Sequence, residues 1–265
     1  VRYFDVPQEY HDAIGGEFYV RELETLREDL AQLAGRAVSE DDLRASIAVY
    51  NDNRRAVRDL YSYRAQKPWQ VPTAEVYLVM RAGNVLPPEA HTALLRDYLA
   101  AAEAEKRPKR DNARVVVTGS FCEQPPLGLI KSIEMAGCYV VDDDFMLVLR
   151  WLLDDVPVEG NPLENLSKAF LHRSASTASK YELRKEEKGQ FLLQSAKKAG
   201  AEGVIFAAPS FCDPALLERP MLQEVLAKHK IPYTAFKYAE NTGQMAPIRE
   251  QAGTFADSIK LWSAA

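Results

Sequence analysis

Two cysteines that follow strand-like runs are the residues most suited to chemistry. Cys212 comes after Val204–Ala208, which is predicted to be a buried strand that breaks at Pro209. Cys122 follows the β-branched run Arg114–Thr118 in the same way. Open α/β sheets bind ligands in the loops beyond the carboxyl ends of their strands, and thiolates hold iron–sulfur clusters. We therefore expect Cys212 to be a cluster ligand, and Cys122 to be a second ligand or a neighbour of the cluster.

The alternative for Cys212 is a small buried hydrophobe, the usual position of a free cysteine. Its polar neighbours Ser210 and Asp213 argue against this. Cys138 directly follows Gly137 and is predicted to be structural. Three cysteines do not make a disulfide framework, which favours a reducing, cytoplasmic setting. Two thiolates are too few for a [4Fe-4S] cluster, so the other ligands lie elsewhere or the site is not a cluster.

Other polar residues near these loops are further candidates. Glu123 and Glu240 are candidate proton-transfer groups, because a loop carboxylate near an apolar cleft can have a raised pKa. Asp142–Asp144 could bind magnesium, but we favour capping of a helix at Phe145 together with solvation. The candidate substrate contacts flank the two cysteines and are Ser120, Phe121, Ser210 and Phe211.

Several functions are excluded or disfavoured by what the sequence lacks. It contains no phosphate loop, no Gly-x-Gly-x-x-Gly, no Cys-x-x-Cys and no Gly-x-Ser-x-Gly. The formal net charge of −5 argues against nucleic acid as a partner. No run of 18 apolar residues occurs, so no membrane-spanning helix is predicted.

The first part of the chain is predicted to be a helical connector. Its leucines recur at three- and four-residue spacing, and Ser39 with the acidic residues after it is typical of a helix N-cap. Thr73 is expected to cap a third helix, and most arginines of the second helix are interpreted as a solvated face. The expected helices are 18–36, 40–66, 74–81 and 91–106.

The second part alternates strands with helices, which predicts a doubly wound, mainly four-stranded parallel sheet of the flavodoxin/Rossmann type. The expected strands are 114–118, 138–141, 204–208 and 233–236. The expected helices are 126–136, 145–153, 164–172, 181–198, 214–228 and 246–262. The fold class is therefore α/β, with a connector at 18–110 and an α/β domain at 111–265. Residues 1–17 are interpreted as the last strand and exit of an amino-terminal α/β domain, which we expect to precede Val1.

The sequence resembles the 2-hydroxyacyl-CoA dehydratase and benzoyl-CoA reductase family over essentially its whole length. The matching segments, in chain order, are Gly35, Ser39, Leu43, Asn51–Arg55, Thr118–Ser120, Ile133–Gly137, Val140–Asp144, Gly203–Ile205, Phe211–Pro214, Glu240–Gln244, Arg249 and Phe255. Within the family, Phe121–Pro126 is most similar to the smaller cluster-binding subunit of ATP-dependent benzoyl-CoA reductases.

The resemblance implies a subunit in which two α/β domains hold a [4Fe-4S] cluster between them. Cys212 matches the ligand of the carboxyl-terminal domain, and the other ligands belong to an amino-terminal domain whose last strand would be Arg2–Val6. It also implies partners: ATP-hydrolysing iron–sulfur activator subunits, ferredoxin as upstream electron donor, and a homologous second cluster-bearing subunit. The substrate implied is an aromatic acyl-CoA, whose ring accepts low-potential electrons and is protonated.

Two other functions remain open at this point. A 2-hydroxyacyl-CoA dehydratase subunit would have a similar fold and cluster but would remove water from its substrate. A non-catalytic, two-lobed protein that holds a small ligand would contain no iron. Anaerobic iron and sulfide analysis separates the second alternative from the enzymes.

Overall fold

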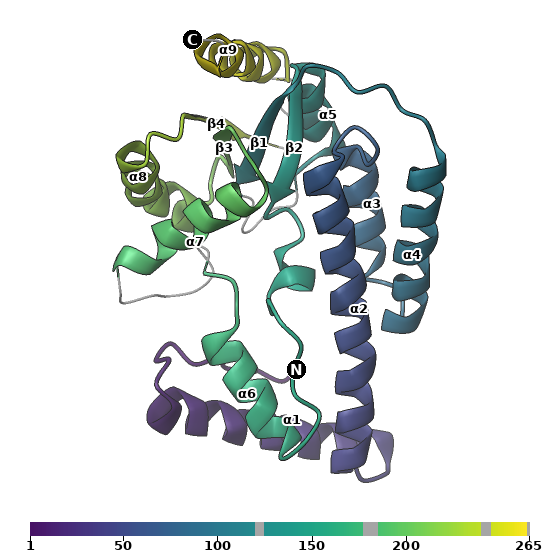
Figure 1. Ribbon diagram of the computed structural model, residues 1–265. Helices are drawn as coiled ribbons and strands as arrows, with labels where there is room; N and C mark the ends of the chain where they lie inside the picture. Colours follow the sequence, from purple (N-terminus) through teal and green to yellow (C-terminus); the bar gives the residue numbers. More distant parts are fainter. Residues whose placement is uncertain (120–124, 177–184, 240–244, 264–265) are drawn as a thin grey trace.

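The computed structural model describes residues 1–119, 125–176, 185–239 and 245–263. A four-stranded sheet lies at the centre of the carboxyl-terminal part (Figure 1), with strand order β2-β1-β3-β4 and every pairing parallel. The strands are β1 (Ala113–Thr118), β2 (Cys138–Asp143), β3 (Gly203–Pro209) and β4 (Tyr233–Tyr238). The predicted α/β fold class and parallel sheet are therefore confirmed.

Helices cover both faces of the sheet because alternate strand residues point to opposite sides. Val115 and Val117 face the larger core, which α5 and α9 cover, whereas Val116 faces the core under α7 and α8. Central strands of a parallel sheet are buried on both faces, and every residue of β3 is buried. The helices of this part are α5 (Leu127–Met135), α6 (Pro162–His172), α7 (Lys185–Lys198), α8 (Asp213–Lys228) and α9 (Met245–Ser263).

Four helices form the connector, as expected. The Ser39 hydroxyl accepts from the Asp42 N–H, and the Asp42 carboxylate accepts from the Ser39 N–H, so a reciprocal capping box starts the second helix. The helices are α1 (Glu17–Ala34), α2 (Glu40–Gln66), α3 (Thr73–Ala82) and α4 (Pro88–Ala104). Within the described residues, no helix is both long enough and apolar enough to cross a membrane.

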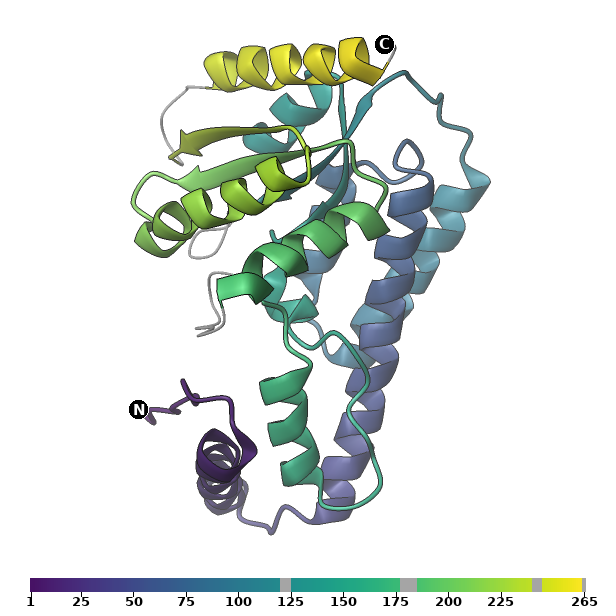
Figure 2. The same cartoon turned by 60° about the vertical axis from the view of Figure 1, so that its left-hand side comes forward.

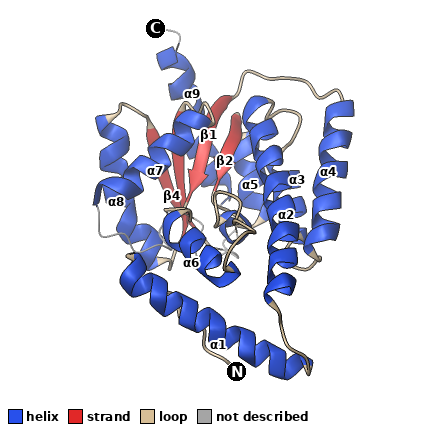
Figure 3. Ribbon diagram, turned by 60° about the horizontal axis from the view of Figure 1, so that its bottom comes forward, coloured by secondary structure: helices blue, strands red, loops and turns tan. Residues whose placement is uncertain are grey.

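The connector reaches away from the sheet. Figure 2 shows α2 running from the sheet towards α1, and Figure 3 shows α1 lying across the end of the molecule next to α6. A π-helical turn, Asp12–Gly16, leads into α1 and also contacts α6. The carboxyl-terminal half of α2 packs on β2. This one helix therefore connects the sheet with the end of the structure where α1 and α6 lie.

Two local predictions were wrong. Residues 145–153 form only a short 3₁₀ turn, Leu147–Arg150, because Asp143 and Arg150 anchor this segment to the end of β2. Pro72, and not Thr73, is the N-cap of α3. No strand is assigned within Val1–Pro7, and its interpretation as the last strand of another α/β domain stays a prediction. The domain boundaries at residues 17 and 110 stay a prediction.

Candidate functional site

The carboxyl ends of the strands meet at one edge of the sheet, where the sequence places its candidates. Strand β3 lies between β1 and β4, so Gly119 and Ala239, the described residues that follow those two strands, flank it. The confirmed parallel sheet therefore places the ends of these strands at one edge. Ser120, Phe121, Cys122, Glu123 and Glu240 themselves lie outside the described residues, so their assigned roles stay predictions.

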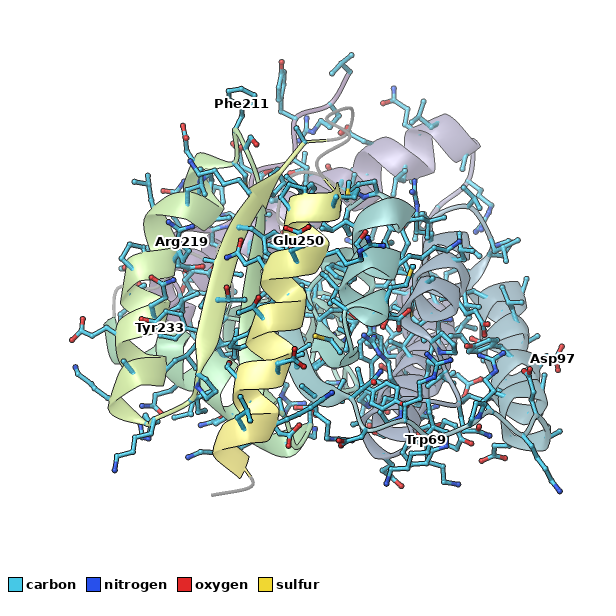
Figure 4. The ribbon with its side chains drawn as sticks, turned by 90° about the horizontal axis from the view of Figure 1, so that it is seen from above. Trp69, Asp97, Phe211, Arg219, Tyr233 and Glu250 are labelled. Atoms are coloured by element: carbon cyan, nitrogen blue, oxygen red, sulfur yellow. The ribbon has the colours of Figure 1, made fainter. Side chains whose placement is uncertain are left out.

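The turn after β3 holds the described candidates in fixed positions. The N–H and the hydroxyl of Ser210 both donate to the carbonyl oxygen of Tyr238, at 2.8 and 3.0 Å, and so fasten the turn to β4. Phe211 is 95% exposed, and Figure 4 shows it projecting at the edge opposite Trp69. The N–H of Cys212 donates to the carbonyl oxygen of Pro209 at 3.1 Å. Cys212 therefore follows the exposed Phe211 in a turn whose backbone is held by hydrogen bonds.

Cys212 is the N-cap residue of α8 and is buried, with 3% of its surface exposed. It packs with Ala208, Ala215 and Leu216, so its surroundings are those of a small hydrophobe although its sequence neighbours are polar. This is the packing expected if Cys212 is a small buried hydrophobe. Its role as a ligand is not tested by this burial.

A [4Fe-4S] cluster needs three or four thiolates, and the described residues supply one at this edge. Over those residues, no three His, Cys, Asp or Glu side chains are arranged to hold a metal ion. Cys138, the other described cysteine, is fully buried in the core at the beginning of β2. Its burial raises the pKa of its thiol to about 12, which keeps it protonated and makes it structural, as predicted. The described residues alone therefore do not form a complete cluster site.

Asp144 joins the ends of β1 and β2. Its Oδ2 accepts from the Thr118 hydroxyl at 2.8 Å and from the Gly119 N–H at 2.7 Å. Gly119 has φ +115°, and an added Cβ would lie 3.0 Å from the backbone oxygen of Ala207 on β3. Glycine at position 119 therefore allows the backbone to lie close against β3 at the end of β1. This is a structural reason for a glycine here, although glycine at this position also occurs in nucleotide sites.

Asp143 is the centre of a buried polar network between α2 and β2. Its carboxylate accepts from Arg64 Nη1 at 2.5 Å, from the Tyr61 hydroxyl at 3.1 Å and from the Phe145 N–H at 3.1 Å. The side chains of Arg64 and Asp143 are 0% and 1% exposed. Asp143 is thus occupied by protein groups. The expected capping of a helix at Phe145 together with solvation is wrong, because the 3₁₀ turn that follows has Met146 as its N-cap residue and no side-chain cap, and Asp143 is buried. These contacts favour a structural role over magnesium binding.

Arg150 extends this network towards the sheet edge. It lies over the Tyr61 ring at 3.6 Å and pairs with Asp142 at 2.9 Å. Burial, followed by the nearby charge of Asp143, raises the pKa of Tyr61, so its phenol stays a neutral hydrogen-bond donor. Burial alone would lower the pKa of Arg64, but the Asp143 carboxylate outweighs it and the pKa is raised.

A small cavity of about 90 Å³ opens beside this network, between the sheet and helices α7 and α8. Its polar lining includes Asp142–Asp144 and Arg150, and its apolar lining includes Phe206 and Leu222. Ala215 borders the cavity and also packs with Cys212. The cavity lies where the chain reverses direction across the sheet, between β1 and β3, which is the ligand-binding position in open α/β sheets.

Sequence reasoning missed the central roles of Arg64 and Arg150. Arg64 follows the buried Leu60 by four residues and therefore lies on the apolar stripe of α2. That spacing was the available signal that this arginine is not part of the solvated face. Arg150 had no such signal, because its partner Asp142 and the Tyr61 ring are brought to it by tertiary structure.

Comparison with known proteins decides the family. A family model described as "2-hydroxyglutaryl-CoA dehydratase, D-component" matches residues 1–259. This chain belongs to that family. The resemblance drawn from the sequence is confirmed, and the relatives include proteins named as subunits of dehydratases and of benzoyl-CoA reductase.

Individual relatives of the family differ greatly in similarity. The C subunit of benzoyl-CoA reductase from Thauera aromatica is 63% identical over 263 residues, which cover 99% of this chain and 68% of that protein. The beta subunit of lactoyl-CoA dehydratase from Anaerotignum propionicum is 26% identical over 260 residues, covering 97% and 68%. The beta subunit of (R)-2-hydroxyglutaryl-CoA dehydratase from Acidaminococcus fermentans is 25% identical over 256 residues, covering 96% and 67%. The reductase protein is therefore the much nearer of these three relatives.

Proposed function

We propose that this protein is the iron–sulfur subunit of an ATP-dependent aromatic acyl-CoA reductase that acts on benzoyl-CoA. The observation that carries the proposal is 63% identity to the C subunit of benzoyl-CoA reductase over 99% of this chain. The dehydratase subunits are 25% and 26% identical over a similar length and support the alternative, 2-hydroxyacyl-CoA dehydration, less well. The reaction class proposed is reduction of CH–CH groups with an iron–sulfur electron donor.

The proposed cofactor is a [4Fe-4S] cluster, which when bound supplies low-potential electrons for reduction of the aromatic ring. Cys212 is the proposed ligand from the described residues, and Cys122 a proposed ligand or neighbour. The remaining thiolates would come from outside these 265 residues. The proposed partners are a homologous second cluster-bearing subunit, ATP-hydrolysing iron–sulfur activator subunits and ferredoxin, and the proposed location is the cytoplasm.

The residues of this chain would position the thiol and shield it from water. Ser210 fastens the turn that carries Cys212, and Ala208, Ala215 and Leu216 surround the thiol with apolar surface. A dry, apolar shell is one means by which a protein tunes the potential of a cluster. Glu123 and Glu240 stay candidate proton donors.

The substrate assignment is tested with anaerobically purified, complete enzyme supplied with its activator, ATP and reductant. We expect turnover of benzoyl-CoA and none of a 2-hydroxyacyl-CoA. Turnover of the 2-hydroxyacyl-CoA alone would refute the reductase function and support the dehydratase alternative. The absence of iron from the complete protein would refute both and favour a non-catalytic binding protein.

The ligand assignment is tested by Cys212→Ser. We expect the complete protein to lose most of its cluster iron and sulfide, because a serine hydroxyl is far less acidic than a thiol and is a poorer ligand for cluster iron. Iron and sulfide analysis and the visible absorption of the cluster are the measurements. Cys138→Ala is the matched control, since Cys138 is also a buried free cysteine, and its iron content should be unchanged. Equal iron in native protein and Cys212→Ser would show that Cys212 is not a ligand.

A further inference from the structure

A group of exposed cations lies on the side of the molecule away from Phe211, although the formal net charge of the protein is −5. Trp69 marks this side in Figure 4. The cations come from the end of α2 and from the linker between α4 and β1, and partly buried aromatic rings lie among them. We call this group the basic patch, and its members are Lys67, Lys109 and Arg110 with the rings of Tyr63, Trp69 and Tyr139.

Aromatic rings hold the two lysines of the basic patch in place. Lys109 Nζ lies 5.0 Å from the centroid of the Trp69 ring. Lys67 Nζ lies 5.2 Å from the centroid of the Tyr63 ring. A cation is attracted to the face of an aromatic ring when it lies within about 6 Å of the centroid. Each lysine therefore has less conformational freedom to lose when it binds a partner.

The backbone of the linker is fixed at both ends. Near its beginning, the Arg107 N–H donates to Gln70 Oε1 at 3.1 Å, and Gln70 Nε2 donates to the Glu105 carbonyl oxygen at 2.6 Å. Near its end, the Arg110 N–H donates to the Tyr139 hydroxyl at 2.7 Å. The cations of the linker are therefore presented from a preorganised backbone.

The three cations of the basic patch have no carboxylate partner in the part of the chain that the structure describes. Arg107, in the same linker, differs from them because it pairs with Glu75 at 3.0 Å and with Glu105 at 2.6 Å. Asp111 follows the linker cations directly and is exposed, but it pairs with none of them. Solvated lysines have flexible stems, whereas these lysines are held against rings, which favours a surface that receives an anionic partner.

We propose that the basic patch docks an acidic face of another protein, whose carboxylates pair with the three cations while its apolar atoms pack against Trp69 and Tyr139. Aromatic residues and arginine are enriched in protein interfaces. A nucleic acid or an anionic membrane extends beyond a patch of this size and meets the net negative charge of the rest of the protein. Bases also stack on aromatic rings, and lysines already lie over Trp69 and Tyr63. The proposal does not depend on the reaction proposed above.

Docking is tested by fluorescence anisotropy of a short labelled peptide of alternating glutamate and glycine, titrated with this protein at low salt. We expect the peptide to bind, and the affinity to fall as the ionic strength rises to about 0.15 M, because exposed charges are screened. Lys109→Glu should weaken binding by about threefold or more, since attraction becomes repulsion. The double variant Lys67→Glu with Lys109→Glu should weaken it by about tenfold or more. Trp69→Leu keeps every charge and should weaken it by about twofold or more, because Lys109 is no longer held.

Arg21→Glu is the matched control for Lys109→Glu. It makes the same change of charge at an exposed position of α1. Figure 2 shows α1 at the end of α2 that lies away from the sheet, whereas the basic patch is at the other end. The affinity of Arg21→Glu for the peptide should therefore equal that of the native protein.

Three results would overturn the proposal: no binding of the peptide, unchanged affinity in the double lysine variant, or an equal loss in Arg21→Glu and Lys109→Glu. Tighter binding of a DNA duplex or of phosphatidylserine vesicles than of the peptide would overturn the choice of a protein as the partner. Thermal unfolding of each variant shows whether it is folded. Lys67 and Lys109 are exposed, so their variants decide the question if Trp69→Leu does not fold.

Discussion

Asp143→Ala is expected to lower the free energy of unfolding by about 3–5 kcal/mol, the usual cost of leaving one partner of a buried ion pair alone. The change would leave the guanidinium of Arg64, whose side chain is 0% exposed, without its carboxylate. Contacts from Arg64 to the Val140 carbonyl oxygen at 2.7 Å and the Thr73 hydroxyl at 3.5 Å remain, but neither carries a charge. Unfolding in urea, followed by far-UV circular dichroism, measures the loss.

Asp52→Ala is the matched control for this experiment. Asp52 pairs with Arg96 at 2.7 Å, but their side chains are 40% and 60% exposed, and an exposed pair contributes at most about 1 kcal/mol. The double variant Arg64→Met with Asp143→Ala should recover part of the stability lost by Asp143→Ala, because it removes the unpaired charge. An Asp143→Ala protein as stable as Asp52→Ala would show that the buried pair does not hold α2 on β2.

Gly119→Ala is expected to cost about 3 kcal/mol of stability, because φ +115° is strained for any residue with a Cβ. The new Cβ would also lie 3.0 Å from the carbonyl oxygen and 3.2 Å from the carbonyl carbon of Ala207, and backbone atoms of a central strand cannot move aside. The backbone at residue 119 would have to move away from β3, which would break the N–H···O contact from residue 119 to Asp144. The same urea titration measures the effect.

Gly35→Ala separates backbone strain from crowding in this comparison. Gly35 ends α1 with φ +64°, and nothing lies within 4 Å of an added Cβ. Its replacement should therefore cost only the left-handed backbone conformation, about 1–2 kcal/mol. Equal losses for Gly35→Ala and Gly119→Ala would mean that the close approach of Gly119 to β3 is unimportant.

The parts of the fold predicted well from sequence were those set by local interactions. Ser39 and Asp42 cap each other across three residues, and the helix they start ends at Gln66 as expected. The strands were found because valine-rich runs between helices are typical of a buried parallel sheet. Their ends were short by up to two residues, since the pairing that extends β2 to Asp143 depends on β1.

The candidate site was predicted less completely because its contacts come from residues distant in the chain. Arg64 and Asp143 are 79 residues apart, and Arg150 meets Tyr61 only in the folded protein. The position of Cys212 after β3 was correct, but its burial was not expected, because Ala208 and Ala215 cover a thiol whose immediate neighbours are polar. The local sequence predicts where the chain leaves the sheet. It does not show which other residues cover a side chain at that point.

The uninterrupted course of α2 also has a mechanical consequence. Close to its middle, Asn51 is bonded to the backbone of Val156 in both directions, each at 2.8 Å, and near its end Arg64 is bonded to β2. No proline or glycine occurs between these points, so no helix-breaking residue interrupts this part of α2. The distance along α2 from Ile47 to Arg64 is roughly 26 Å at 1.5 Å per residue, so a tilt of about 10° at Arg64 would move Ile47 by roughly 4–5 Å. A small rotation of α2 at Arg64 would therefore be amplified at Ile47, which packs with Val156 and Ala169.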